Sequence, residues 1–358
     1  MNTSLKTLAV LAMGLGTGMA AVQASASELV FVSWGGSYQD AQNATTVKPY
    51  AAKSGVQIKS DTYNGGIAQI RSQVQTKNVT WDVVDMQLAD VTRACDEGLL
   101  EKVDTGSLPA ASTGVAAKAD FAPGALSDCM VGNVAWSTVI AYNKQAFKSA
   151  QPKTVRDFFD LKRFPGKRAL RKSPEAALEW ALLADGVPAA DIYKVLATPA
   201  GVDRAFKKLD TIKSSIVWWE TGAQPPQLLA DGEVTMSSAY CNRIYTAMAQ
   251  DKKPFGFVWD GEVKNVEGYA IVKGSQNVKA AQDFLRYATS TGTLASLASA
   301  TALGPLRKSS LSQVDPKVAP YLPTAAENQK NAINTDVEFW ADHSDDLNQR
   351  FAVWLGQK

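Results

Sequence analysis

Stretches typical of β-strands alternate with stretches typical of α-helices along most of this chain of 358 residues, and this alternation constrains the fold more than any other feature. The series opens with the apolar run Leu29 to Val32, which lacks polar alternation and suits a strand buried on both faces. We expect strands over residues 28–34, 56–62, 82–87, 134–142, 168–171, 234–240, 255–259 and 267–272. We expect helices near residues 39–53, 66–77, 88–97, 175–184, 201–213, 224–230, 242–250, 277–289, 292–299, 323–331 and 344–355. The pattern predicts an α/β protein with a mainly parallel sheet.

The first 26 residues have the three regions of a secretory signal peptide. Lys6 precedes an apolar stretch from Leu8 to Val22, and Ala24 and Ala26 give the small-residue spacing of a cleavage site. We predict cleavage after Ala26, where no cysteine is present to accept a lipid. Removal of Lys6 lowers the formal charge from +2 to +1. The sequence therefore predicts an exported protein, most simply of a bacterial periplasm.

Composition narrows the classes of function. Near-neutral charge argues against a nucleic acid as the main partner. The single histidine, His343, and the absence of a Cys-x-x-Cys spacing in the sequence argue against a metal site and a Ser-His-Asp arrangement, so we expect no cofactor. In an oxidising compartment two of the three cysteines should pair. We expect a Cys95–Cys129 disulfide, since both lie in one predicted lobe, and we interpret Cys241 as a small buried residue.

Length and two β-rich segments predict a two-lobed organisation. The chain exceeds the usual size of one domain. Residues 133–143 and 267–274 are interpreted as crossings between lobes, because the first lies where a lobe of ordinary size would end and the second leads back into a helix. A chain that leaves a lobe and returns to it forms a hinge. We expect residues 27–137 and 267–358 in lobe 1 and residues 138–266 in lobe 2.

Aromatic, amide and glycine residues follow the ends of the first three strands. Trp34 and Tyr38 flank a Gly-Gly-Ser sequence that lets backbone N–H groups approach a ligand closely before a helix begins. Tyr63 precedes an Asn-Gly-Gly turn, and Gln87 ends the third strand. The carboxyl ends of parallel strands meet at one edge of a sheet. We therefore expect Trp34, Ser37, Tyr38, Tyr63 and Gln87 to line one crevice.

The second half of the chain supplies charges of both signs. Tyr240 and Arg243 follow a strand end, and Glu267 and Tyr269 lie at the second crossing. A guanidinium group binds a carboxylate in bidentate fashion, whereas an acid beside an aromatic ring suits an amine. Arg243 facing the ligand would fit an amino-acid-like zwitterion. Arg243 held in an internal salt bridge would leave a site for a diamine or a polyamine.

Two short runs in the expected second lobe have alternative interpretations. Trp218 and Trp219 are adjacent, so in a strand their side chains face opposite ways, and Trp219 is our candidate for the cleft. Six basic side chains lie within residues 162–172 around a Phe-Pro-Gly turn. We interpret them as a solvated face, with a docking patch for a partner protein as the alternative.

Several of these segments together resemble a known family. The likeness covers residues 29–38, Trp81-Asp-Val-Val, residues 94–104, Phe164-Pro-Gly-Lys-Arg, residues 229–236 and Tyr269-Ala-Ile with Lys273-Gly274. The chain resembles the extracellular solute-binding components of ABC transporters, in the polyamine (spermidine/putrescine) branch that includes binders of γ-aminobutyrate. This resemblance implies a two-lobed type II periplasmic-binding-protein fold with two hinge-crossing segments and a ligand between the lobes. It also implies ligand contacts from the first lobe at Trp34 and Tyr38 and from the second at Tyr240 and Arg243, with Glu267 in the place of the acid that holds an amine.

The expected function is that of a periplasmic solute-binding component of an ABC importer. We expect a monomer that captures a small amine by lobe closure and delivers it to a permease in the inner membrane. The sequence departs from the polyamine branch at Asn265, where an aromatic is usual, and at Cys241-Asn242, where Asn-Gly is typical. With Arg243, these departures favour a zwitterion such as γ-aminobutyrate over putrescine or spermidine. A secreted hydrolase with a pair of cleft carboxylates and a chemosensory ligand-binding adaptor are the alternatives.

Overall fold

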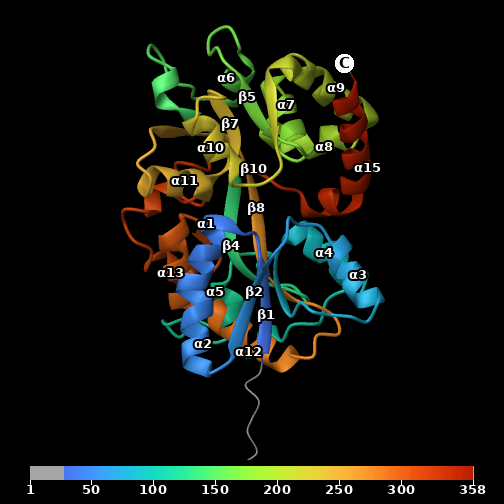
Figure 1. Ribbon diagram of the computed structural model, residues 1–358, viewed down its shortest axis with the longest axis vertical. Helices are drawn as coiled ribbons and strands as arrows, with labels where there is room; N and C mark the ends of the chain where they lie inside the picture. The colour runs from blue at the N-terminus through green and yellow to red at the C-terminus, as the bar shows by residue number, and fades with distance from the viewer. Residues whose placement is uncertain (1–27, 358) are drawn as a thin grey trace, which may run out of the picture.

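The computed structural model describes residues 28–357 and shows two lobes, one above the other, joined by long strands at the waist (Figure 1). The predicted signal peptide and its cleavage site lie outside the described residues. Both lobes have a sheet covered by helices on its faces, the α/β arrangement that the alternating sequence pattern predicts.

Lobe 1 contains the first residues that the structure describes and a later return of the chain. Its strands are β1 (Glu28–Ser33), β2 (Gln57–Thr62), β3 (Val83–Gln87) and the short β9 (Gly304–Pro305). Its helices are α1 (Gly36–Gln42), α2 (Lys48–Ser54), α3 (Ala68–Gln75), α4 (Leu88–Asp96), α5 (Ala117–Asp120), α12 (Val278–Ala288), α13 (Thr291–Thr301) and α14 (Lys308–Leu311), and a π-helical stretch over Asn43–Val47 joins α1 to α2.

Lobe 2 contains β5 (Arg168–Arg171), β6 (Ile216–Trp219) and β7 (Met236–Tyr240). Its helices are α6 (Val155–Phe159), α7 (Ala177–Ala184), α8 (Ile192–Leu196), α9 (Pro199–Asp210), α10 (Gln224–Ala230) and α11 (Cys241–Ala249). The sequence analysis did not expect β6 among the strands, and it expected a helix over 323–331, where the structure has turns.

Two long strands run through both lobes. They are β4 (Val131–Asn143) and β8 (Phe255–Ile271), which pair antiparallel along most of their length. The sheet order is β2-β1-β3-β8-β4-β7-β5-β6. Pairing is parallel on the two flanks and antiparallel where β4 and β8 pair with each other and with β3 and β7, because the crossing strands carry the chain in opposite directions. The sheet is therefore mixed, and the expected strands 255–259 and 267–272 are parts of one strand of 17 residues.

A third segment also passes from one lobe to the other. The short strand β10 (Ile333–Asn334) pairs with β8 at Val263 and Lys264, beside the hinge, and leads into the C-terminal helix α15 (Val337–Gly356). Apolar residues of α15 pack into the core of lobe 2, against Phe206 of α9 and Trp218 of β6. Figure 1 shows α15 beside α9. The sequence analysis assigned residues 267–358 to lobe 1, whereas α15 packs on lobe 2.

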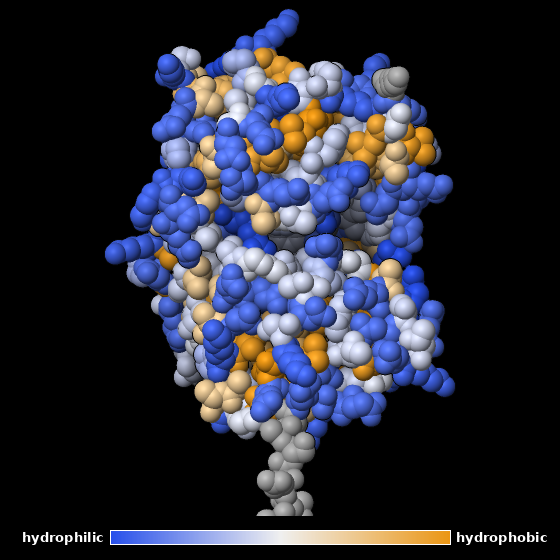
Figure 2. All heavy atoms as spheres, in the orientation of Figure 1, coloured by the Kyte–Doolittle hydropathy of each residue, from blue (hydrophilic) through white to orange (hydrophobic). Residues whose placement is uncertain are grey.

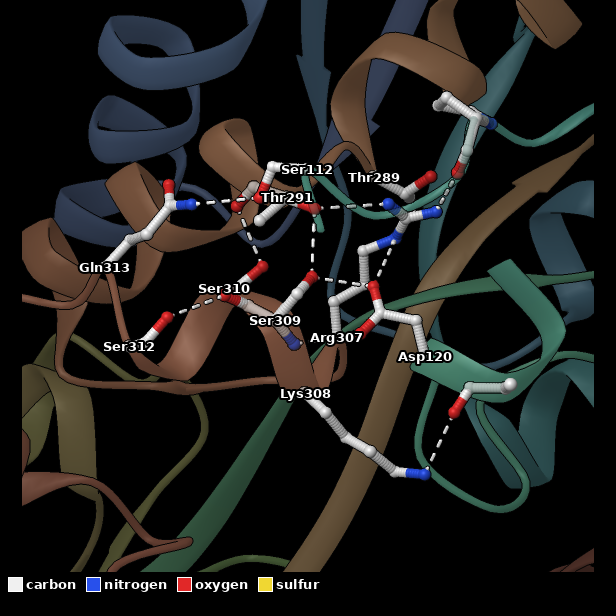
Figure 3. Close-up of polar contacts among 12 residues, drawn as sticks. Ser112, Asp120, Thr289, Thr291, Arg307, Lys308, Ser309, Ser310, Ser312 and Gln313 are labelled. Atoms are coloured by element: carbon white, nitrogen blue, oxygen red, sulfur yellow. Dashed lines mark hydrogen bonds and ion pairs between the residues drawn. The ribbon is translucent and has the colours of Figure 1, made fainter. Parts of the chain in front are cut away.

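Buried Arg307 links the segment between α4 and β4, which includes α5, to the last helices of lobe 1 (Figure 3). Arg307 is fully buried, and its Nε lies 3.7 Å from the carboxylate of Asp120. Its Nη2 donates to the carbonyl of Pro109 at 2.5 Å, and its Nη1 contacts the hydroxyl of Thr291 at 3.4 Å. The N–H and the hydroxyl of Ser309 both donate to Asp120, at 2.9 and 2.7 Å. Asp120 thus compensates the buried charge of Arg307.

The structure pairs Cys95 with Cys129, the two cysteines that the sequence analysis paired, with their Cα atoms 6.0 Å apart. The disulfide closes the base of the same irregular segment. Cys241 is a free, buried thiol at the start of α11, where burial raises its pKa to about 12. It is therefore protonated at ordinary pH.

Candidate ligand-binding site between the lobes

A cavity of about 250 Å³ lies between the lobes. This is below the range of roughly 300–1,000 Å³ usual for drug-sized ligands, so the cavity suits a small molecule. Lobe 1, lobe 2 and the crossing strands all contribute to its wall, and the surface is hollowed at the corresponding level, at the waist (Figure 2). The lining residues are Trp34, Gly35, Gly36, Tyr38, Thr62, Tyr63, Asn64, Gln87, Trp136, Arg171, Glu220, Thr221, Gly222, Ala223, Tyr240, Asn242, Arg243, Glu267 and Leu303.

The turn after β1 brings lobe 1 into contact with lobe 2. Gly35 and Gly36 both have positive φ values, 64° and 57°, which favour glycine. A Cβ atom on Gly36 would lie 2.7 Å from Nη1 of Arg243. The turn therefore needs glycine both for its backbone conformation and for the close approach of the arginine.

The floor of the cavity has a buried carboxylate beneath it. Asp85 is fully buried and accepts hydrogen bonds from the hydroxyl of Tyr38 at 3.0 Å, from Gln42 at 2.6 Å and from Asn133 at 3.0 Å. Burial raises the pKa of Asp85 to about 7, although these three hydrogen bonds oppose the rise. The hydroxyl of Tyr63 donates to the backbone carbonyl of Asp85 at 2.8 Å, so both tyrosines are held from below.

Glu267 presents a second carboxylate, on the wall of the cavity. Its side chain is buried, and no Lys or Arg among residues 28–357 lies within ion-pair distance of it. Burial raises the pKa of Glu267 well above its ordinary value, and the neighbouring charge of Asp85 raises it further. A ligand ammonium group beside Glu267 would stabilise its ionised carboxylate directly and that of Asp85 from a longer distance.

Arg243 reaches from α11 of lobe 2 across to lobe 1. Its Nη2 donates to the carbonyl of Gly35 at 2.7 Å, and its Nη1 donates to the hydroxyl of Ser37 at 3.1 Å. The side chain is buried, yet the structure places no carboxylate of the described residues within 4.0 Å of it. The positive charge is therefore held by neutral acceptors and is free to attract a ligand carboxylate.

A second guanidinium group lies at the other side of the cavity. Arg171 ends β5, and its guanidinium carbon lies 6.0 Å from the centre of the Tyr240 ring. Its nearest acidic partner, Glu175, is 3.9 Å away. Arg171 and Arg243 balance Glu267 and Glu220 among the lining residues. The wall of the cavity thus has equal numbers of positive and negative side chains.

The structure brings most of the predicted site residues together. Trp34, Tyr38, Tyr63, Gln87, Tyr240, Arg243 and Glu267 line the cavity. Ser37 does not line it but accepts the hydrogen bond from Arg243.

Trp219 and Tyr269 do not reach the cavity. Trp219 is fully buried in the core of lobe 2, where its indole N–H donates to Ser238 at 2.9 Å and its ring supports Tyr240 at 5.4 Å. Tyr269 is fully buried in the core of lobe 1 between Phe31 and Phe284. Both rings are enclosed because helices cover the faces of the sheet on which they stand.

Sequence reasoning missed several residues that the structure places at the site. Trp136 lies in the first crossing and lines the cavity, but the segment was interpreted only as a hinge. Arg171 was assigned to a solvated basic face, although it ends a parallel strand, the position that identified Trp34 and Gln87. Asn242 and Glu220 follow strand ends as well. The strand-end rule, applied to every strand, would have found these three.

Other kinds of site find no support in the part of the chain that the structure describes. Residues 28–357 contain no cluster of His, Cys, Asp and Glu that could hold a metal ion. None of the helices described is both long and apolar enough to cross a membrane.

Comparison with known proteins identifies the family. Residues 45–324 match the bacterial extracellular solute-binding protein family. The chain belongs to this family. It is 42% identical over 338 residues to the γ-aminobutyric acid-binding protein of Pseudomonas aeruginosa, a match that covers 94% of each chain. The family, together with this relative, makes the protein a solute-binding component of an ABC importer that acts in the periplasm with a membrane permease, and not an enzyme.

Solved structures of solute-binding proteins have the same fold. The periplasmic binding protein MotA of A. tumefaciens B6, in complex with glucopine, is 34% identical, with a TM-score of 0.84 over 92% of this chain and 99% of MotA. The Atu4243 γ-aminobutyrate receptor is 36% identical, with a TM-score of 0.81 over 93% of this chain and 98% of the receptor. The two-lobed fold is therefore that of periplasmic binding proteins, and the hydrolase alternative is ruled out.

Proposed function

We propose that this solute-binding protein captures an ω-amino acid of the γ-aminobutyrate type and releases it to an ABC permease. One observation carries the proposal: the guanidinium of Arg243 and the carboxylate of Glu267 line the same small cavity, and neither forms an ion pair within 4.0 Å among the described residues, although the two attract each other at longer range. A zwitterion would pair with both. Burying these two charges without partners is costly, so a ligand with complementary charges gains affinity by compensating them.

The balance of charge favours a zwitterion over a polyamine. A polyamine carries only positive charge, and Arg243 and Arg171 would both face it inside a buried cavity. The sequence analysis expected a polyamine site only if Arg243 were held in an internal salt bridge. Arg243 instead donates to neutral acceptors of lobe 1.

The relatives support the same class of ligand. Two of the proteins to which this chain is similar, the one from Pseudomonas aeruginosa and Atu4243, are described as binding γ-aminobutyrate. A longer ligand with the same amino-acid end is a second candidate, because the cavity opens toward a wider depression of about 680 Å³ with which it shares Trp34, Gln87 and Arg171. MotA was solved with glucopine, which makes that compound a useful competitor in an assay.

In the closed form the two halves of the site lie together, with Arg243 of lobe 2 in contact with Gly35 and Ser37 of lobe 1. Trp34, Tyr38 and Tyr63 of lobe 1 would enclose the ligand against Tyr240 of lobe 2, with the ammonium group at Glu267 and the carboxylate at the arginines. Closure is then a shift of population driven by the additional contacts of the ligand with the closed form. We also propose that the signal peptide is cleaved after Ala26 and that the mature protein is a monomer.

A thermal-shift screen tests the proposal. Purified protein starting at Ser27 would be screened with γ-aminobutyrate, other amino acids, glucopine, putrescine and spermidine, since a ligand that binds only the folded form raises the melting temperature. We expect a rise with ω-amino acids that is lost in Arg243→Gln. A rise confined to putrescine and spermidine would contradict the proposal.

A further inference from the structure

The C-terminal helix α15 lies beyond the part of the chain that matches the family, which ends at residue 324. It follows the third crossing, β10, and forms one side of the wide depression outside the ligand cavity. None of its residues lines the ligand cavity itself. The contacts of α15 therefore serve a purpose other than direct recognition of the ligand.

Helix α15 is firmly attached to lobe 2. Phe351 and Trp354 pack against Phe206 of α9 and Trp218 of β6, with ring centres 5.5–6.3 Å apart. The indole N–H of Trp354 donates to Asp210 at 2.8 Å. Because these contacts include buried aromatic rings, the helix should move with lobe 2 as one body.

The first half of the same helix contacts lobe 1. Arg93 of α4 donates to both carboxylate oxygens of Asp345, at 2.9 and 3.3 Å, and to the hydroxyl of Ser344 at 3.3 Å. Ala89, one turn earlier on α4, packs against the core cluster of lobe 2 that includes Trp340. In Figure 1 the lower end of α15 lies next to α4. The bidentate pair thus spans the rim of the cleft.

From this geometry we propose that Arg93 and Asp345 are positioning residues that set ligand affinity from outside the cavity. The pair joins the lobes when they are closed and is broken when lobe 2 carries α15 away from α4. Any contact made only in the closed form favours closure and slows ligand release, even if it never touches the ligand. The inference rests on the proposed capture of a ligand by lobe closure.

The effect should be modest because the pair is partly solvated. The side chain of Asp345 is 84% exposed and that of Arg93 is 19% exposed. Pairs of this kind contribute little, so losing one should weaken binding roughly two- to fivefold. The loss should appear mainly in the dissociation rate, since the pair forms after the lobes have met. It should also shrink at high salt.

The same helix offers a matched control. Arg350 of α15 pairs with Asp203 of α9 at 2.7 Å, and the Asp203 side chain is 73% exposed. This ion pair is similar in kind but lies entirely within lobe 2. Asp203→Asn should therefore leave affinity unchanged, whereas Asp345→Asn and Arg93→Gln should each weaken binding.

The first experiment measures γ-aminobutyrate dissociation by stopped-flow tryptophan fluorescence in the wild type, Arg93→Gln, Asp345→Asn, the double variant and Asp203→Asn. We expect the two single variants and the double variant to show the same acceleration, because each removes one shared interaction. Unchanged rates in Arg93→Gln and Asp345→Asn would overturn the inference. Equal acceleration in Asp203→Asn would overturn it as well, since the effect would then reflect a general disturbance of α15.

The second experiment needs no ligand. Spin labels on Lys118→Cys in lobe 1 and Lys194→Cys in lobe 2 report the distance between the lobes, and buried Cys241 should not react with the label. We expect Asp345→Asn to shift the ligand-free distribution toward longer distances relative to Asp203→Asn. If γ-aminobutyrate does not bind the wild type, the proposed function fails, and this distribution still tests the role of the pair: identical distributions would refute it.

Discussion

Affinity for a zwitterionic ligand should fall as the pH decreases below about 7. In the free protein, burial raises the pKa of Asp85 to about 7, and burial together with the charge of Asp85 raises the pKa of Glu267. A bound ammonium group stabilises the ionised carboxylates and lowers their pKa. Binding then releases a proton at any pH between the bound and free pKa values. Affinity therefore rises with pH over the range in which Asp85 ionises, up to about 7.

The magnitude follows from the number of protons released. One proton per ligand changes the dissociation constant about tenfold per pH unit, or about 1.4 kcal/mol. Between pH about 5 and about 7 the constant should fall by up to roughly 100-fold, or ~2.7 kcal/mol. The hydrogen bonds from Gln42, Tyr38 and Asn133 oppose the rise in the pKa of Asp85, so the part of the pH dependence that Asp85 contributes should end near pH 7.

Isothermal titration calorimetry across this pH range measures the constant, and buffers with different heats of ionisation count the protons. Asp85→Asn should flatten the profile. Glu179→Gln is the matched control. Burial raises the pKa of Glu179 to about 8, but this carboxyl group lies in lobe 2, outside the cavity, where it accepts hydrogen bonds from Tyr193 and Trp340. A constant that does not vary with pH, with no proton released in either buffer, would refute this account of the acidic floor.

Three further predictions concern stability and can be checked by urea denaturation. Trp219→Ala should lower the free energy of unfolding by about 3–5 kcal/mol, because the ring is fully buried; a loss of affinity at unchanged stability would instead return Trp219 to the ligand site. Replacing Cys95 and Cys129 by serine should cost roughly 4 kcal/mol, from the entropy of a loop of about 34 residues in the unfolded chain; an unchanged midpoint would count against a bonded pair. Asp120→Ala should cost about 3–5 kcal/mol by leaving buried Arg307 without its anion, and a neutral result would show that the carbonyl acceptors suffice.

Local sequence rules located much of the cavity. Trp34, Tyr38, Tyr63 and Gln87 were predicted because a strand end followed by a glycine turn or by the start of a helix has one geometry wherever it occurs in an α/β sheet. The first crossing was predicted because residues 133–143 form a long β-rich run where a lobe of ordinary size would end. The second was predicted because residues 267–274 lead back into a helix, although the full length of β8 was not expected.

The helix that covers a given face of the sheet could not be predicted in the same way. Alternation along β6 placed Trp218 and Trp219 on opposite faces, but neither ring lines the cavity: Trp219 is fully buried and Trp218 is partly buried. Trp218 packs against Phe351 and Trp354, more than 130 positions later in the chain, and Trp219 faces Ser238. The side that a helix such as α15 covers depends on long-range packing, which sequence periodicity does not specify.

The two arginines show the same limit for charge. A run of basic residues is most often a solvated face, and that rule hid Arg171, whose position at a strand end turns it into the cavity. For Arg243 the sequence left a ligand contact and a salt bridge open. In the structure, Arg243 donates to the backbone carbonyl of Gly35 and to the hydroxyl of Ser37. Both acceptors belong to the opposite lobe, so local sequence could not identify them.

Calorimetric titration with three compounds of similar size tests most directly whether the cavity recognises both charges of its ligand. The compounds are γ-aminobutyrate, butylamine, which lacks the carboxylate, and butyrate, which lacks the amine. Removing one partner of a buried charge pair costs about 2–5 kcal/mol, so each truncated compound should bind at least about 30-fold more weakly than γ-aminobutyrate. Butylamine binding as tightly as γ-aminobutyrate would contradict the role of Arg243, and equal binding of butyrate would contradict that of Glu267.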